Sequence, residues 1–356
     1  MMHRLQKNSA YTRRLPEGCK RCGMGQKLVL FVTGICNNKC FYCPLSAEKR
    51  GRDVVFANEK KVAKTEDIIQ EARLIDATGT GITGGDPLAK IDRTIKYINL
   101  LRENFGEKHH IHLYTATASR KMAKALAESG LDELRLHPPP SLWGKMRNSG
   151  FDSSIAAAIG GGMKVGVEIP AIPKMDKPIL SLISYLDSIG ADFVNLNELE
   201  FSETNCTALL SRGYRVKDDV SSGVAGSEKM ARGIIKKADS DIPLHYCSAS
   251  YKDGVQLRNR IMRRAKNIAK PSDIISDEGL LVKGILEGSN LNAVRTELVL
   301  KFKIQKTLIH IDKEKKRLEI APWILEKIAL RIPHPCYIVE EYPTADRLEV
   351  ERMRIN

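Results

Sequence analysis

The sequence predicts an α/β fold, namely an open, partial (β/α)6 TIM-like barrel followed by a smaller C-terminal α+β domain. Three observations support this. Short apolar runs alternate with amphipathic helical stretches from about residue 28 to residue 247, which predicts parallel strands joined by right-handed crossovers. Six such units and a weaker seventh fall short of the eight of a closed barrel. After residue 272 short strands predominate.

Four regions are expected. They are an N-terminal extension at 1–27, the barrel at 28–250, a basic linker helix at 251–271 and the C-terminal domain at 272–356. The predicted barrel strands are 28–34, 79–85, 110–115, 132–138, 164–170, 192–200 and, more weakly, 242–247. The helical stretches between them include 65–77, 90–104, 119–129 and 178–189. In the C-terminal domain we expect strands that include 297–304 and a helix that begins near Pro322.

The chain has 356 residues, enough for one large domain and a smaller one. No run of about 18 uncharged apolar residues occurs, so no membrane-spanning helix is expected. The basic N-terminal segment lacks the apolar stretch of a secretory signal. Eight cysteines in such a chain favour metal or redox chemistry over a disulfide framework. We therefore expect a cytoplasmic protein.

Polar residues follow one face of several predicted strands. Arg135 and His137 alternate with leucines, and Asn195 and Asn197 alternate with Val194 and Leu196 in the same way. The apolar face is expected to meet the helices, so the polar face lines the barrel interior. A polar interior needs a ligand or water to satisfy it. The sequence therefore predicts a binding cavity at the carboxyl ends of the strands, with these four polar residues as catalytic candidates.

A loop with three cysteines follows the first predicted barrel strand, in the segment LVLFVTGICNNKCFYCP. Its thiols are Cys36, Cys40 and Cys43. A structural zinc site is normally closed by four protein ligands, so three thiols on one loop favour a site with an open coordination position. Soft sulfur ligands select zinc or iron–sulfur clusters. A zinc knuckle or a set of buried thiols is the alternative.

The loop resembles the signature of the radical SAM superfamily, Cys-x3-Cys-x-aromatic-Cys, with Tyr42 at the aromatic position. The resemblance covers about residues 26–250 and is nearest to the pyruvate formate-lyase activating enzyme-like proteins of anaerobic microbes. It implies a [4Fe-4S] cluster on the three cysteines and S-adenosylmethionine on the fourth iron. Reductive cleavage of this cofactor would yield a 5′-deoxyadenosyl radical.

The same resemblance implies residues that hold S-adenosylmethionine. Gly84-Gly85-Asp86, one β/α unit after the cysteine loop, is similar to the Gly-Gly-Glu motif that contacts the amino group in this family, although Asp86 is shorter than Glu. Thr115 and Glu168 lie at strand ends where the family contacts the ribose or the methionyl carboxylate. The expected cofactor-binding residues are Tyr42, Gly84, Gly85, Asp86, Thr115 and Glu168.

A second metal site is expected at Cys19 and Cys22, a Cys-x2-Cys pair in a Gly-rich, basic segment. We assign Cys247 to it because this residue ends a predicted late strand. An auxiliary iron–sulfur cluster or zinc would suit these ligands. The sequence offers no fourth ligand, and free thiols or a local loop staple are alternatives.

The substrate is expected to be a tRNA nucleoside. The formal charge of +14 and the basic helix after Val255, which includes Arg263 and Arg264, favour a polyanion. One alternative is radical activation of a protein, as by a glycyl-radical activating enzyme. Another is a non-catalytic iron–sulfur or zinc sensor that binds nucleic acid. A one-electron donor of the flavodoxin or ferredoxin type is expected in either enzymatic case, no membrane partner is expected, and the oligomeric state is not predicted.

Overall fold

The computed structural model describes residues 2–147 and 149–356. These fall into two compact units. Unit 1 takes in the residues up to Arg73 and Ala77–Leu257, and unit 2 takes in Leu74–Asp76 and Arg258–Asn356. In the described part of the chain no helix is both long and apolar enough to span a lipid bilayer.

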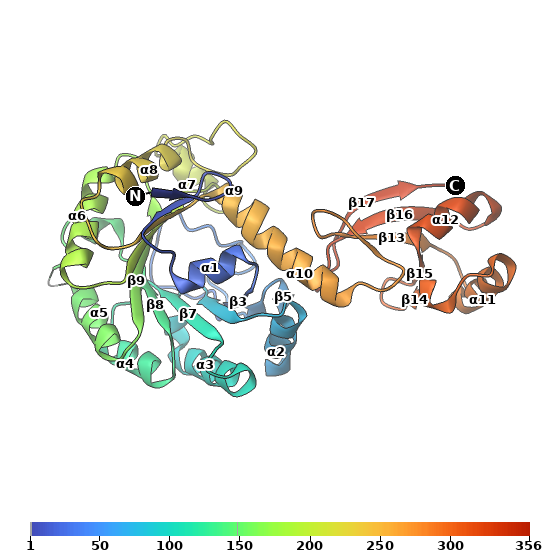
Figure 1. Ribbon diagram of the computed structural model, residues 1–356, viewed down its shortest axis with the longest axis horizontal. Coiled ribbons are helices and arrows are strands. Elements are labelled where there is room, and N and C mark those ends of the chain that lie inside the picture. Colours follow the sequence, from blue (N-terminus) through green and yellow to red (C-terminus); the bar gives the residue numbers. More distant parts are fainter. Residues whose placement is uncertain (1, 148) are drawn as a thin grey trace. The chain divides into compact units, whose positions relative to one another are not determined.

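Unit 1 is built on an 11-stranded sheet whose seven central strands are parallel and curl into an open barrel (Figure 1). In spatial order these strands are β11 (Leu244–Cys247), β10 (Phe193–Glu198), β9 (Lys164–Ala171), β8 (Glu133–Leu136), β7 (His110–Thr115), β6 (Gly79–Thr83) and β3 (Lys27–Phe31). The antiparallel strands β2 (Ala10–Thr12) and β1 (Met2–Arg4) extend one edge, and β4 (Phe56–Ala57) and β5 (Lys60–Lys61) extend the other. The predicted partial barrel is confirmed, with its weaker seventh strand included.

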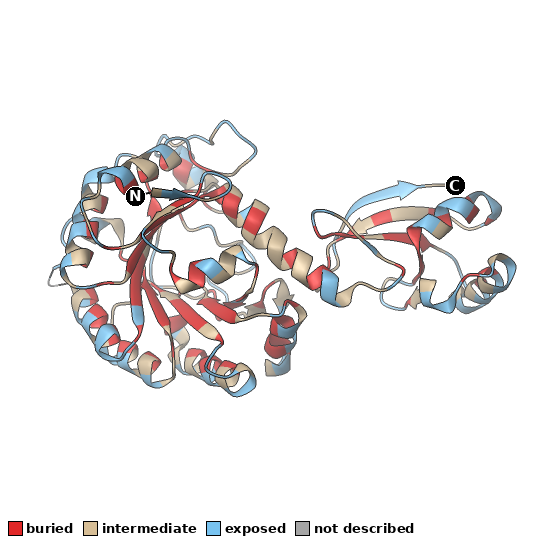
Figure 2. Ribbon diagram, viewed as in Figure 1, coloured by how far each residue is buried: buried red, intermediate tan, exposed pale blue. Residues whose placement is uncertain are grey.

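Helices cover the outside of the barrel (Figure 1). They are α2 (Thr65–Leu74), α3 (Ile91–Phe105), α4 (Arg120–Glu128), α5 (Gly150–Gly160), α6 (Asp176–Ser188) and α8 (Ser227–Lys237), with the short α7 (Cys206–Leu210) after β10. The outward strand residues Leu113, Leu134 and Val165 are buried with Leu101 and Leu126 of the helices. Figure 2 shows buried strands and helices that expose their outer sides. The apolar faces of the strands therefore meet the helices, as their alternation predicts.

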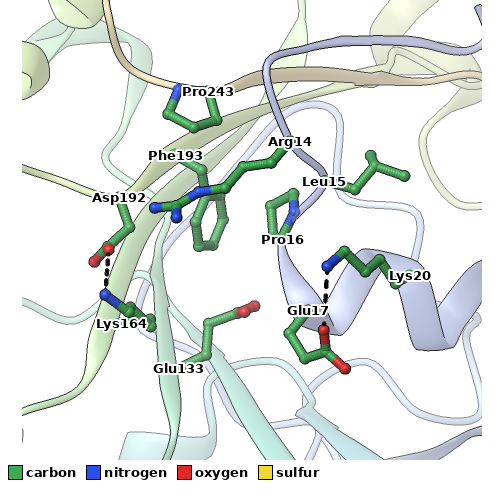
Figure 3. A pocket seen from close by; sticks show the side chains of 10 residues that line it. All are labelled: Arg14, Leu15, Pro16, Glu17, Lys20, Glu133, Lys164, Asp192, Phe193 and Pro243. Carbon is green, nitrogen blue, oxygen red and sulfur yellow. Dashed lines mark ion pairs between the residues drawn. The ribbon is translucent and has the colours of Figure 1, made fainter. Parts of the chain in front are cut away.

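The helix α1 (Glu17–Gly23) lies inside the barrel (Figure 1). A Cβ atom on Gly18 would lie 2.5 Å from Arg135 Nη2 and 2.5 Å from His112 Nδ1, both on the inner face of the sheet. Only glycine fits this contact. Figure 3 shows Glu17 and Lys20 of α1 beside Glu133, where a cavity of about 170 Å³ lies at the amino ends of the strands. The predicted N-terminal extension thus contributes two edge strands and a helix that fills the lower barrel.

Unit 2 is an α+β domain with an antiparallel sheet in the order β14 (Ile309–Asp312), β15 (Arg317–Ile320), β13 (Leu281–Leu286), β16 (Cys336–Glu341) and β17 (Glu349–Arg354). The short β12 (Ile274–Ile275) pairs with β13. Its helices are α10 (Arg258–Ile268), which continues from α9 (Ala249–Tyr251) through a π-helical turn at Lys252–Leu257, α11 (Leu291–Phe302) and α12 (Pro322–Ile328).

The predicted strand at 297–304 is wrong, because most of this segment belongs to α11. Its alternating apolar residues suggested a strand. Asn290 starts a helix instead, since its side chain accepts a hydrogen bond from the Ala293 backbone N–H. Val294 and Leu298 then lie one turn apart and are both buried in the apolar core of unit 2, while Leu300 is 74% exposed. The helical spacing of Val294 and Leu298 was the decisive pattern.

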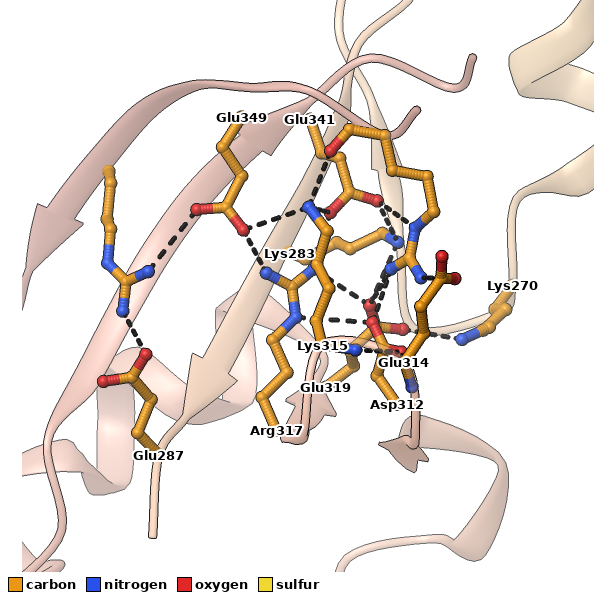
Figure 4. A network of polar contacts seen from close by, with 12 residues as sticks. Lys270, Lys283, Glu287, Asp312, Glu314, Lys315, Arg317, Glu319, Glu341 and Glu349 are labelled. Carbon is orange, nitrogen blue, oxygen red and sulfur yellow. Dashed lines mark hydrogen bonds and ion pairs between the residues drawn. The ribbon is translucent and has the colours of Figure 1, made fainter. Parts of the chain in front are cut away.

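One face of the unit 2 sheet carries a buried network of charges (Figure 4). Lys283 Nζ lies 3.1 Å from both Glu319 Oε1 and Glu341 Oε1, and Arg317 Nη2 lies 2.6 Å from Glu341 Oε2. Each of these four residues is at most 4% exposed. Arg347 reaches the same carboxylates, at 2.9 Å from Glu341 and 3.0 Å from Glu319. Each buried charge of this network therefore has a partner of opposite charge, without which its burial would be strongly unfavourable.

We predict that Glu341→Gln destabilises unit 2 by about 3 kcal/mol, since it removes the partner of buried cations. Burial alone would raise the pKa of Glu341, but Lys283 and the neighbouring Lys315 and Arg347 outweigh it and lower the pKa from 4.5 to about 2. The ionised Glu341 carboxylate therefore makes its full contribution to the free energy of unfolding above pH 4.5, and this contribution is lost as the pH falls towards 2. Urea unfolding of the full chain at a series of pH values measures this. The difference between wild type and variant should shrink on acidification, and the exposed Glu351→Gln should be neutral; a pH-independent difference would contradict the prediction.

Candidate active site

A cavity of about 540 Å³ lies at the carboxyl ends of the parallel strands. Ligands of open α/β sheets bind at this end. The cavity is lined by the cysteine loop, by the end of β6 and by the ends of β7, β9 and β10. Of the residues predicted from the sequence it includes Cys36, Cys40, Tyr42, Cys43, Gly84, Gly85, Thr115, His137, Glu168 and Asn197. The structure thus brings most of the predicted site residues to one cavity.

The three thiols of the cysteine loop all line this cavity and are partly buried. Burial raises the pKa of Cys36 and of Cys40. The loop is fixed from outside, because Asn205 Nδ2 donates to the Tyr42 carbonyl oxygen at 3.1 Å and Thr204 Oγ1 donates to the Leu45 carbonyl oxygen at 2.7 Å. In residues 2–147 and 149–356, no three side chains of Cys, His, Asp or Glu are drawn together as a ready-made metal site. Three soft donors on one loop at a ligand-sized cavity nevertheless fit an iron–sulfur cluster with one open corner.

Gly84 and Gly85 directly follow β6 and pack against the backbone of the segment that leads into the cysteine loop. A Cβ atom on Gly84 would lie 2.5 Å from the Thr33 carbonyl oxygen, and one on Gly85 would lie 2.5 Å from the Gly34 carbonyl oxygen. The Gly85 N–H donates to the Thr33 carbonyl oxygen at 2.7 Å. The glycines are needed here because the two backbones touch, and they still line the cavity.

Asp86 does not line the cavity, but it binds residues at the end of β7 next to it. It is 2% exposed, and both of its carboxylate oxygens accept hydrogen bonds. Oδ1 accepts from Leu88 N at 3.0 Å and Thr115 Oγ1 at 2.8 Å, and Oδ2 accepts from Ala116 N at 3.3 Å and Thr117 Oγ1 at 2.7 Å. This carboxylate therefore fastens the end of β7 to the glycine turn. The ligand contact that the resemblance implies stays a prediction.

Glu168 presents a carboxylate to the cavity from the middle of β9. Arg135 Nη1 donates to its Oε2 at 2.7 Å, Asn195 Nδ2 donates to the same oxygen at 2.8 Å, and Asn197 Nδ2 donates to Oε1 at 2.8 Å. Burial alone would raise the pKa of Glu168, but Arg135 and the two amides lower it. Glu168 is consequently ionised and held in one orientation, a fixed anion at the floor of the cavity.

Two of the four catalytic candidates lie below this floor. Arg135 and Asn195 are each 2% exposed and do not line the cavity. Arg135 also binds Glu133, with its Nε 2.6 Å from Glu133 Oε1. These two residues position Glu168 and do not reach the cavity. Asn197 lines the cavity but also binds Glu168.

His137 links the cysteine loop to the barrel. Its Nδ1 lies 2.7 Å from the Glu168 carbonyl oxygen and its Nε2 lies 3.0 Å from the Tyr42 hydroxyl. A carbonyl oxygen only accepts, so Nδ1 carries the proton and Nε2 accepts from Tyr42. Burial lowers the pKa of His137, so the ring is neutral near pH 7. A neutral histidine of fixed tautomer therefore orients Tyr42, the aromatic residue of the loop.

An ion pair in the cavity wall was not predicted from the sequence. Lys252, just after α9, pairs with Glu200, which follows β10, and both line the cavity. Burial alone would lower the pKa of Lys252, but Glu200 raises it, so the lysine is charged. Neither residue belongs to a recognisable motif. Only the predicted order of the strands could have placed them together.

The thiols of the expected second site lie on α1 and at the end of β11. Cys19 and Cys247 are buried, at 7% and 5% exposed, and Cys22 is partly buried. Burial raises the pKa of Cys247, and Cys19 and Cys22 are close enough to raise it further. The structure thus brings Cys247 into the neighbourhood of the Cys-x2-Cys pair.

An open parallel barrel with three thiols at its carboxyl end defines a class of cofactor-dependent enzyme. Comparison with known proteins gives the family. Residues 30–138 match the Radical SAM superfamily, and residues 279–355 match a domain of unknown function (DUF8061). The chain is 44% identical to the "Putative glycyl-radical enzyme activating enzyme MJ0021" of Methanocaldococcus jannaschii, over 96% of this chain and 92% of that protein.

The chain belongs to the radical SAM superfamily, in its group similar to pyruvate formate-lyase activating enzyme. It is an enzyme whose cofactors are a [4Fe-4S] cluster and S-adenosylmethionine.

Solved structures of other superfamily members show weaker similarity. HydG, a maturase of the [FeFe]-hydrogenase, is 18% identical with a TM-score of 0.42, over 62% of this chain and 51% of that chain. Methylornithine synthase (PylB) is 16% identical with a TM-score of 0.40, over 63% and 70%. Streptococcus suis SuiB bound to S-adenosylmethionine is 17% identical with a TM-score of 0.41, over 63% and 50%. The chain spans about half the length of HydG and SuiB.

We predict that Asp86→Ala lowers the affinity for S-adenosylmethionine by about tenfold or more while iron content stays normal. The variant leaves two threonine hydroxyls and two backbone N–H groups without their acceptor. Each buried polar group that loses its partner costs about 1–3 kcal/mol, and a loss of about 1.4 kcal/mol in binding free energy is tenfold in affinity. Isothermal titration of the anaerobically reconstituted protein measures the affinity. Asp92→Ala, at an exposed position in the first turn of α3, is the control. Unchanged affinity in Asp86→Ala would contradict the supporting role of this carboxylate.

Proposed function

We propose that this protein is an activating enzyme that generates a radical on a glycine of a partner protein. The observation that carries the proposal is the 44% identity, over 96% of the chain, to a protein named as a glycyl-radical enzyme activating enzyme. Activation of a protein is the function predicted from the sequence as the alternative to a tRNA substrate. Family membership also argues against a non-catalytic sensor.

In this proposal Cys36, Cys40 and Cys43 hold the cluster, and S-adenosylmethionine occupies the adjoining cavity between Gly84–Gly85 and Glu168. When bound, the two cofactors and one electron from a flavodoxin- or ferredoxin-type donor supply a 5′-deoxyadenosyl radical and free methionine. The bound cofactors would thereby supply the acceptor for one hydrogen atom of a partner C–H bond, with 5′-deoxyadenosine as the product that receives this hydrogen.

The chain's own residues bind, orient and exclude water around this chemistry. Glu168 is a fixed anion that can accept hydrogen bonds from hydroxyl or ammonium groups of a ligand. Lys252 and Glu200 supply a charged pair across the same cavity. His137 is neutral and hydrogen-bonded at both nitrogens, so it positions Tyr42 and is not suited to be a general base.

The case for tRNA is weakened by the basic residues of α10. Arg263 Nε donates to the Ile75 carbonyl oxygen at 2.7 Å, and Arg258 Nε lies 3.2 Å from Glu278 Oε2. Arg264 is 7% exposed and donates to the Pro343 carbonyl oxygen. Arg264 is buried, and Arg258 and Arg263 already bind other residues of unit 2, so these side chains are less available to phosphate groups. The net charge of +14 alone does not select a nucleic acid.

We predict that Cys36→Ala abolishes reductive cleavage of S-adenosylmethionine, because the cluster loses one of its three protein ligands. The measurement is 5′-deoxyadenosine formed by anaerobically reconstituted protein with a chemical reductant. Cys206→Ala is the matched control, since Cys206 Sγ donates to the Glu203 carbonyl oxygen outside the cavity lining. Cleavage retained in Cys36→Ala would remove this cysteine from the cluster site.

The substrate class can be tested by isotope transfer. Proteins from source cells grown on glycine deuterated at its α-carbon should donate deuterium to 5′-deoxyadenosine, as detected by mass spectrometry. Bulk tRNA from cells grown in heavy water should donate no deuterium to 5′-deoxyadenosine. The Cys36→Ala protein is the blank for both. Deuterium received from the tRNA and not from the protein would overturn the proposed function and restore the nucleoside substrate.

A further inference from the structure

A second set of metal-binding side chains lies on α1 and β11, inside the barrel and outside the lining of the cavity. We propose that Cys19, Cys22, Cys247 and His245 bind a single zinc ion, apart from the radical site. Two of these side chains come from α1 and two from β11, so the ion would fasten the internal helix to the last parallel strand.

The two cysteines of α1 face the inner wall of the barrel. Cys19 and Cys22 are three residues apart on the helix, which places their side chains on one face. Cys19 Sγ accepts a hydrogen bond from Asn195 Nδ2 at 3.2 Å and lies 3.5 Å from Arg135 Nη2. The end of α1 meets Tyr251, because a Cβ atom on Gly23 would lie 2.6 Å from the Tyr251 hydroxyl oxygen. The helix is therefore held beside β10 and beside the turn that follows β11.

The two donors of β11 point into the same space. His245 and Cys247 are two residues apart on the strand, so their side chains lie on the same face. In the sheet His245 is opposite Asn195 and Cys247 is opposite Asn197. Since Asn195 touches Cys19, the imidazole of His245 is on the strand next to the contact with α1. Three thiols and one imidazole thus come from two elements that face one another.

His245 is the observation that points to a ligand. It is 2% exposed, and both of its ring nitrogens are buried without a hydrogen-bond partner among the described residues. A buried polar group left unpaired costs about 1–3 kcal/mol. A neutral imidazole with a free ring nitrogen is a common metal ligand. The sequence offered no fourth ligand for the cysteines, and the structure supplies this one.

The ligand set and its surroundings favour one ion over a cluster. Three cysteines and one histidine form a closed tetrahedral zinc set. None of the four side chains lines the 540 Å³ cavity, and they are packed against neighbours such as Gln256, whose Nε2 lies 3.5 Å from Cys247 Sγ. Three thiolates and Zn²⁺ leave one negative charge, next to the Arg135 cation. Because no three of the donors yet surround one point, the ion must draw them together on binding.

The test uses the full chain with Cys36→Ala, Cys40→Ala and Cys43→Ala, which removes the radical site and makes the result independent of the proposed function. Elemental analysis after purification should give about one zinc ion per chain. Adding Cys22→Ser or His245→Ala should remove the zinc, and adding His245→Cys should keep it. Cys206→Ser and Cys336→Ser are the controls that should leave it in place, because these cysteines lie on α7 and β16, away from the inner barrel.

A second measurement needs no variant of the four ligands. Replacing zinc with Co²⁺ in the triple-alanine protein should produce the strong visible bands of tetrahedral cobalt bound to thiolates. Absence of both zinc and these bands would overturn the proposal. Iron and sulfide in place of zinc, or zinc that survives both Cys22→Ser and His245→Ala, would overturn it as well.

Discussion

The barrel depends on the Arg135 guanidinium, a fully buried cation held between two carboxylates. Glu133 lies beneath it and Glu168 above it, and Cys19 of α1 touches its edge. Removing such charges from water costs several kcal/mol for each ion, so the arrangement persists only if all partners stay in place. Arg135 therefore separates the lower half of the barrel, which α1 occupies, from an upper half that holds the larger cavity.

This division explains how the reactive end is kept in order. The cysteine loop follows a short strand and has little regular structure of its own, yet it is fixed by contacts from three other segments. The glycine turn touches its backbone, His137 holds the Tyr42 hydroxyl, and Asn205 holds the Tyr42 carbonyl oxygen. Because Glu168 supplies both the carbonyl that orients His137 and the carboxylate bound to Arg135, the order of the buried network extends to the loop. A site that handles a radical requires such support from rigid elements.

The features that the sequence predicts well are those encoded locally. The alternation of strands and helices predicted the barrel, and the alternation of polar and apolar residues along each strand predicted its polar interior. The spacing of Cys36, Cys40 and Cys43 indicated the family. The features it did not reveal come from contacts between distant residues. Nothing in the segment around Gly18 shows that a helix there fits against Arg135, and nothing beside Asp86 shows that both its oxygens are taken by Thr115 and Thr117. Similarly, the arginines of α10 form a basic pattern in the sequence, although the structure uses them for internal contacts.

The two groups of thiols differ in the surroundings that decide their chemistry. The loop cysteines border a large cavity, which leaves room for a ligand to complete the metal site. The thiols of α1 and β11 lie outside this cavity, and β11 also carries a histidine whose ring nitrogens have no hydrogen-bond partner among the described residues. An open set suits catalysis and a closed set suits structure. An ion in the closed set would hold α1 against Arg135 from the far side, and so would stabilise the floor on which the catalytic cavity rests.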